Sequence, residues 1–131
     1  MKVKILLKFY FNAAVLNERL DRLITYNACK SAEGLNFEKI TALIEDKSKL
    51  CNLMNYLDGK LERLTEADKR TLEIYANLRI GIRNLKDGER REIKRAVMKF
   101  TRKLTYIERH KEEVCVLQKY RAILNCPLNM P

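Results

Sequence analysis

Residues 40–64 read ITALIEDKSKLCNLMNYLDGKLERL, and their apolar side chains recur mostly at intervals of three and four. This spacing places them on one stripe of an α-helix, and such a stripe is buried against another in a folded protein. Lys47 interrupts the stripe, as a snorkelling or register-setting residue does. The stripe consists of Ile40, Leu43, Leu50, Met54, Leu57, Leu61 and Leu64.

Two other segments carry the same pattern, and both prolines of the chain stand at its end. We therefore predict an all-α fold, an antiparallel helical bundle of three to four long amphipathic helices with coiled-coil-like packing. The first segment contains Leu6, Phe9, Ala13, Leu16, Leu20 and Leu23. The last contains Ile93, Val97, Phe100, Leu104 and Ile107.

The length of 131 residues suits one core, so we expect a single helical domain over residues 1–131. Thr65-Glu-Ala-Asp68 resembles a capping box and predicts a helix start, although a mere kink there would leave three helices. Lys86-Asp87-Gly88 is either a turn or the cap of a long final helix. The expected helices cover residues 3–29, 36–64, 66–86 and 89–125.

The chain has 27 Lys and Arg against 17 Asp and Glu, which gives a net charge of +10. This balance favours acidic partners such as nucleic acid or an anionic membrane. The basic, apolar start resembles a secretory signal, but Lys8 interrupts it and the helical spacing continues, so we expect a core helix there. No stretch approaches the roughly 20 apolar residues of a transmembrane helix.

The four cysteines lie far apart and form no Cys-x-x-Cys pair. Because the chain is long enough to build a core without disulfides, we expect reduced thiols and a cytoplasmic location. The alternative is a secreted bundle with two disulfides, which a free-thiol assay would reveal. The cysteines are Cys29, Cys51, Cys115 and Cys126.

Residues 90–103 contain seven cations and a single acid, Glu92. On a helix these cations spread over the side opposite the apolar stripe, where they could follow the phosphates of a nucleic acid or another polyanion. Tyr106 could stack on a base. The alternative is an ordinary solvated face. The candidate polyanion-binding residues are Arg91, Lys94, Arg95, Lys99, Arg102, Lys103 and Tyr106.

The sequence predicts no enzyme. His110 is the only histidine, and nothing marks Ser31 or Ser48 as activated nucleophiles. His110 and Glu113 are one helical turn apart, yet a di-metal bundle site needs two Glu-x-x-His motifs and two further carboxylates. The chain also has no glycine-rich phosphate loop. We therefore expect no catalytic residues, no metal and no cofactor.

The apolar pattern changes register after Ile107 and widens into a band near the C-terminus. A final helix that changes its face partway could leave this band exposed for a protein partner or a second copy of the chain. The alternative is a thicker core that absorbs the band. The candidate partner-binding residues are Val114, Leu117, Tyr120, Ile123 and Leu124.

Residues 35–50, LNFEKITALIEDKSKL, follow a first helix and a short loop. This arrangement resembles the start of the second helix in flagellar type III export chaperones, over roughly residues 16–124. The resemblance implies a small, non-catalytic helical protein that holds a secreted subunit. Those chaperones are commonly acidic, so the charge of +10 and the four cysteines depart from their pattern and leave the client open. No functional residue carries over.

The sequence thus favours a non-enzymatic helical interaction or adaptor protein, chaperone-like in character, that docks a protein through its last helix. The alternative is a basic helical protein that binds nucleic acid or another polyanion through residues 90–103.

Overall fold

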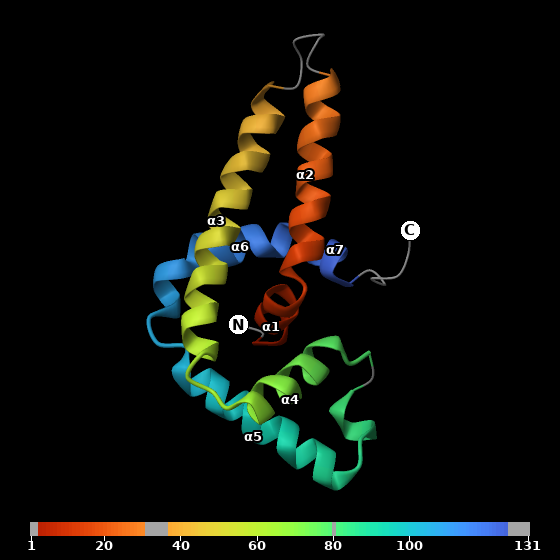
Figure 1. Ribbon diagram of the computed structural model, residues 1–131, viewed down its shortest axis with the longest axis vertical. Coiled ribbons are helices and arrows are strands. Elements are labelled where there is room, and N and C mark those ends of the chain that lie inside the picture. Colours follow the sequence, from red (N-terminus) through yellow and green to blue (C-terminus); the bar gives the residue numbers. More distant parts are fainter. Residues whose placement is uncertain (1–2, 31–36, 80, 126–131) are drawn as a thin grey trace. The chain divides into compact units, whose positions relative to one another are not determined.

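The chain folds into helices that pack against one another as in a bundle (Figure 1). The computed structural model describes residues 3–30, 37–79 and 81–125, and no strand occurs among them. The predicted all-α class is confirmed. The helices are α1 (Val3–Phe11), α2 (Ala13–Lys30), α3 (Phe37–Leu61), α4 (Glu66–Asn77), α5 (Asp87–Lys103), α6 (Lys111–Lys119) and α7 (Arg121–Asn125), with 3₁₀ turns η2 (Ile82–Asn84) and η3 (Ile107–His110).

The chain divides into two compact units, each made of two separate stretches of sequence. Unit 1 contains Met1–Phe11 and Asn55–Arg109. Unit 2 contains Asn12–Met54 and His110–Pro131. Helix α3 therefore contributes its last residues to unit 1 and the rest to unit 2. The expectation of a single domain stays a prediction.

In unit 1, helix α4 packs against both α1 and α5 (Figure 1). The Nζ of Lys4 on α1 donates to the carbonyl of Leu78 at 3.0 Å and lies 5.3 Å from the ring centroid of Tyr75. Apolar burial supplies most of the attraction between these helices. The buried apolar side chains of unit 1 are Ile5, Leu6, Leu7, Phe9, Leu57, Leu61, Leu64, Leu72, Ala76, Ile93, Ala96 and Phe100.

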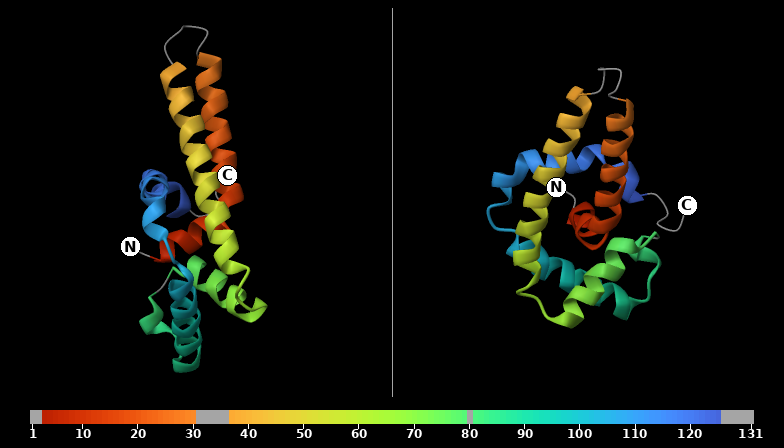
Figure 2. Two further views of the ribbon diagram at one scale, coloured as in Figure 1. Left: turned by 90° about the vertical axis from the view of Figure 1, so that its left-hand side faces the viewer. Right: turned by 45° about the horizontal axis from the view of Figure 1, so that its top comes forward.

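In unit 2, helices α2 and α3 run side by side in opposite directions (Figures 1 and 2). Lys47, the residue that interrupts the apolar stripe, forms an ion pair with Asp21 across this helix pair. Lys47 is therefore a polar link between two helices. The buried apolar side chains of unit 2 are Leu16, Leu20, Leu50, Leu53, Val114, Val116, Leu117 and Leu124.

The first predicted helix, 3–29, is interrupted at Asn12, which the sequence analysis missed. The Asn12 carbonyl accepts hydrogen bonds from the amides of Val15 at 3.1 Å and Leu16 at 3.3 Å, so a new helix begins there. Asparagine favours such positions because its side chain competes with the helical backbone for hydrogen bonds. The apolar stripe continues through the break, which is why spacing alone did not reveal it.

Helices α3 and α4 are both shorter than expected. Residue 36 lies outside the described residues, and α3 ends at Leu61 instead of residue 64. The break before α4 is a true turn, because the Thr65 hydroxyl caps the helix by accepting from the Asp68 amide at 3.2 Å. Helix α4 then ends at Asn77 instead of residue 86, and Leu78 is extended.

The expected final helix, 89–125, is three separate helices in the structure. Helix α5 starts two residues earlier, at Asp87, and ends at Lys103. Two side chains from α3 form hydrogen bonds with Thr105, just after the end of α5. Tyr56 donates to the Thr105 carbonyl at 2.6 Å, and Lys60 donates to the Thr105 hydroxyl at 2.9 Å. These contacts stabilise the end of α5 at Lys103, which the local sequence does not predict.

Leu72 and Ile74 on α4 offer a matched test of the packing of unit 1. Leu72 is fully buried, whereas Ile74 is 60% exposed. We expect Leu72→Ala to lower the free energy of unfolding by about 2–5 kcal/mol, since it leaves a cavity. Ile74→Ala should change it by no more than about 0.5 kcal/mol. Chemical denaturation followed by circular dichroism measures both, and equal effects would contradict this core.

Tyr10 on α1 provides a test by pH. Its hydroxyl donates to the Asp58 carboxylate at 2.7 Å. Burial first, and then the hydrogen bond to Asp58 and its negative charge, raise the pKa of Tyr10 to about 12. Because the raised pKa belongs to the folded state, the stabilisation is complete below about pH 10 and declines as the pH rises from there towards 12.

We therefore expect Tyr10→Phe to be less stable than the wild type at pH 8, and the difference to shrink by pH 11. Chemical denaturation of both proteins at the two pH values measures it. A difference that grows with pH would contradict the hydrogen bond to Asp58.

Candidate functional site: the basic surface of α5

The positive charge of the chain is concentrated in unit 1. Of the 27 Lys and Arg, 18 belong to unit 1 and 9 to unit 2. The 17 Asp and Glu divide into 9 and 8, so the net charges are +9 and +1. A polyanion is thus attracted mainly to unit 1.

Helix α5 carries the densest group of these cations. Its first turn contains Asp87 and Glu89, and its last turn contains Arg102 and Lys103. Acids near the N-terminus and bases near the C-terminus both complement the helix dipole, which favours a helix over this stretch. The buried residues Ile93, Ala96 and Phe100 fix which side of α5 faces the core.

The opposite side of α5 forms an exposed stripe, here called the basic stripe, of Arg91, Arg95, Met98 and Arg102. Spacings of four, three and four residues keep these side chains on one line of the helix. At 1.5 Å per residue the line is about 16 Å long. Met98 is 53% exposed between the arginines, so the stripe combines charge with an apolar contact.

The structure separates the predicted cations into paired and unpaired groups. Lys99 Nζ lies 3.2 Å from Asp68 Oδ2, which compensates its charge. Outside the predicted set, Arg90 likewise pairs with Asp87. The other predicted cations have no carboxylate partner within the described ranges. This unpaired group is Arg91, Lys94, Arg95, Arg102 and Lys103.

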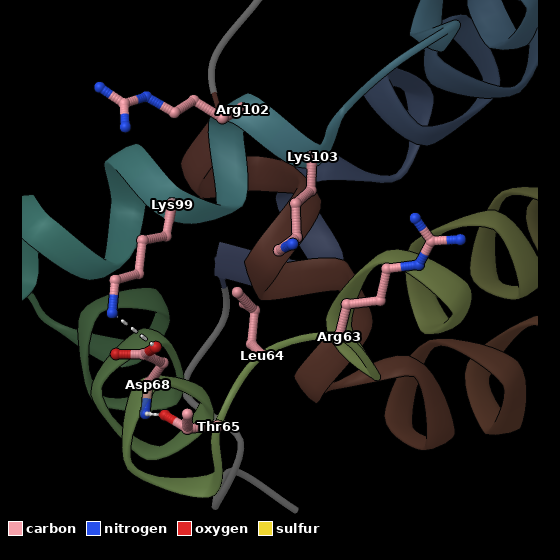
Figure 3. Close-up of a pocket in the computed structure, with 7 residues that line it drawn as sticks. All are labelled: Arg63, Leu64, Thr65, Asp68, Lys99, Arg102 and Lys103. Atoms are coloured by element: carbon pink, nitrogen blue, oxygen red, sulfur yellow. Dashed lines mark hydrogen bonds and ion pairs between the residues drawn. The ribbon is translucent and has the colours of Figure 1, made fainter.

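A cavity of about 410 Å³ adjoins the C-terminal end of the basic stripe (Figure 3). One wall is the connection between α3 and α4 with the first turn of α4, and the other wall is the end of α5. Lys99 points to Asp68 in the first turn of α4 and Lys103 points towards Leu64 in the α3–α4 connection, whereas Arg102 extends away from both (Figure 3). The cavity, here called the basic pocket, is lined by Arg63, Leu64, Thr65, Asp68, Lys99, Arg102 and Lys103.

Arg63 is the residue of this site that sequence analysis missed. It lies in the α3–α4 connection, about 40 residues from the cations that it joins. The cations of α5 could be grouped from helical periodicity, but Arg63 joins them only through the packing of unit 1.

Tyr106 occupies a different position from the one that we expected. The prediction placed it on the face of a continuous helix, but α5 ends at Lys103 and Tyr106 takes a positive φ of 62° after the break. Tyr106 is 64% exposed, and its ring centroid lies 4.6 Å from the guanidinium carbon of Arg109. It stays close to α5 in sequence and remains accessible for stacking.

The predicted partner-binding residues are not an exposed apolar face. The exposed fractions of Val114, Leu117 and Leu124 are 9%, 0% and 4%. Ile123 and Tyr120 are half-buried. The widened apolar band that follows the register change is therefore mostly absorbed into the interior, and partner binding through it stays a prediction.

Tyr120 is held inside unit 2 by a polar contact. Its hydroxyl donates to Asp46 Oδ2 at 2.6 Å, and Lys119 Nζ lies 3.6 Å from Asp46 Oδ1. Burial, followed by the hydrogen bond and the charge of Asp46, raises the pKa of Tyr120 above its usual value. Tyr120 thus attaches the end of α6 to α3.

His110 and Glu113, the pair one helical turn apart, lie close together in the structure. His110 Nδ1 lies 3.7 Å from Glu113 Oε1. Within residues 3–30, 37–79 and 81–125, no three histidine, cysteine or acidic side chains gather as a metal site would require. Cys29, Cys51 and Cys115 are free and exposed, and Cys126 lies outside the described residues. None of the helices in the described part of the chain is long and apolar enough to span a bilayer.

Comparisons with protein-family models, with curated proteins and with solved structures found no match. The resemblance to flagellar export chaperones stays a prediction.

Removal of the Tyr120 hydroxyl tests its role in unit 2. We expect Tyr120→Phe to lower the free energy of unfolding by about 1 kcal/mol or somewhat more, because the Asp46 carboxylate loses a donor. Tyr106→Phe is the control on a tyrosine that is 64% exposed. Denaturant titration measures both, and an equal or larger loss for Tyr106→Phe would contradict the structural role of Tyr120.

Proposed function

We propose that this protein binds nucleic acid through the basic stripe of α5. The observation that carries the proposal is the line of unpaired, exposed arginines, about 16 Å long, on the side of α5 opposite its buried residues. Each arginine that neutralises a phosphate releases a condensed counterion, so several together produce binding without base recognition.

The spacing of the stripe suits a phosphate backbone. Arg91, Arg95 and Arg102 lie on one line about 16 Å long, so they can contact different phosphates of the same strand. Exposed Met98 and Tyr106 add apolar and stacking contacts, which favour a nucleic acid with accessible bases.

This proposal takes precedence over protein docking through the last helices. The basic stripe is accessible, whereas three of the five side chains predicted to bind a protein are buried. The proposed activity is binding alone and includes no chemical step.

A salt titration tests the proposal. We expect the wild type to bind a fluorescent single-stranded oligonucleotide at low salt, with an affinity that falls steeply as salt rises. Arg91→Gln with Arg95→Gln should weaken binding and reduce the slope of log K against log salt by about 1.5, because two phosphate contacts are lost. Fluorescence anisotropy measures both quantities.

The matched control replaces two exposed cations of unit 2, Lys39→Gln with Arg121→Gln. It changes the net charge of the protein by the same amount and should leave the slope nearly unchanged. Equal effects of the two double variants would show attraction by net charge only and would contradict a site on α5. No binding by the wild type at low salt would refute the function itself.

A further inference from the structure

We propose that the basic pocket binds a phosphomonoester, the terminal phosphate of a nucleic acid strand whose internal phosphates contact the basic stripe. This inference rests on the proposed function. Arg102 belongs to both the stripe and the pocket lining, so the C-terminal end of the stripe adjoins the pocket.

The charge of the pocket matches a doubly charged group. Lys99, whose side chain is 47% exposed, is compensated by Asp68 at 3.2 Å, and the Asp68 side chain is 17% exposed, so this pair lines one wall without adding net charge. Arg63 and Lys103 line the same cavity and have no carboxylate partner in the part of the chain that the structure describes. A phosphomonoester near neutral pH carries about 1.5 to 2 negative charges, whereas an internal phosphodiester carries one.

The pocket also offers a neutral donor and an apolar contact. The Thr65 oxygen accepts from the Asp68 amide at 3.2 Å, which leaves the hydroxyl hydrogen free to donate to a phosphate oxygen. Leu64 is buried beside it and contributes apolar lining. Figure 3 shows the side chain of Lys103 extending towards Leu64, whereas the guanidinium of Arg63 extends outward on the other wall. A phosphate at Lys103 would lie beside Leu64 and Thr65, with Arg63 at the rim of the cavity.

The shape of the site favours a strand end. The basic stripe lies on the outward side of a helix, where internal phosphates can follow it. The pocket instead lies on the flank of α5 that bears Lys99 and Lys103, and it has walls from two elements. A terminal phosphate, which is bonded to the strand on one side only, can turn away from the stripe and enter the pocket.

The test compares oligonucleotides of one sequence that carry a 5′-phosphate, a 3′-phosphate or hydroxyls at both ends. We expect the wild type to bind at least one phosphorylated form about threefold to tenfold more tightly than the hydroxyl form, since two additional exposed ion pairs each contribute a small factor. Fluorescence anisotropy with the dye placed internally measures the ratio.

Arg63→Gln with Lys103→Gln should abolish this preference and retain most of the salt-dependent binding. Arg91→Gln with Arg95→Gln is the matched control, which should weaken all three oligonucleotides and keep the ratio. Circular dichroism checks that both double variants remain helical. A ratio that survives in Arg63→Gln with Lys103→Gln would overturn the assignment of the pocket.

The other outcomes separate the two proposals. If the wild type binds all three oligonucleotides equally, the pocket inference fails and the proposed function stands. If it binds none of them, both fail. Competition by adenosine 5′-monophosphate identifies the source of the phosphate: equal potency to the phosphorylated oligonucleotide would overturn the strand end as the ligand, and much weaker competition supports it.

Discussion

The burial of one side of helix α5 is the constraint on which the candidate site depends. Ile93, Ala96 and Phe100 occupy the core of unit 1, and a rigid helix must then present its other side outward. The outward positions carry arginines with few acids among them. The packing energy of a few apolar side chains thus fixes the direction in which the charges point, and no cation has to be positioned by its own contacts.

Much of the fold follows from the sequence because it depends on local rules. Apolar side chains at intervals of three and four predicted the helices, and Thr65 with Asp68 predicted the start of α4. The prediction of a capping box was only half right. Thr65 caps the helix as expected, but the Asp68 carboxylate pairs with Lys99 on α5 instead of bonding back to the cap. A partner from a distant helix competed successfully with the local one.

The breaks at Asn12 and Leu104 could not be predicted from spacing, because both lie within continuous apolar patterns. The second break depends on Tyr56 and Lys60, which bind Thr105 from a helix more than 40 residues earlier. The same limit applies to the site. Periodicity grouped the α5 cations, whereas Arg63 and the burial of Leu117 depend on tertiary packing. The charge of the site could therefore be predicted from the sequence, whereas the pocket beside it depends on how α3, α4 and α5 pack.

The uneven division of charge has a further consequence for the stability of the protein. Unit 1 has a net charge of +9 and unit 2 a net charge of +1. The folded state of unit 1 therefore experiences electrostatic self-repulsion, whereas unit 2 experiences almost none. Ions that screen this repulsion, or an anionic ligand that neutralises it, stabilise one half of the chain selectively. Salt therefore acts on the stability of the protein mainly through unit 1.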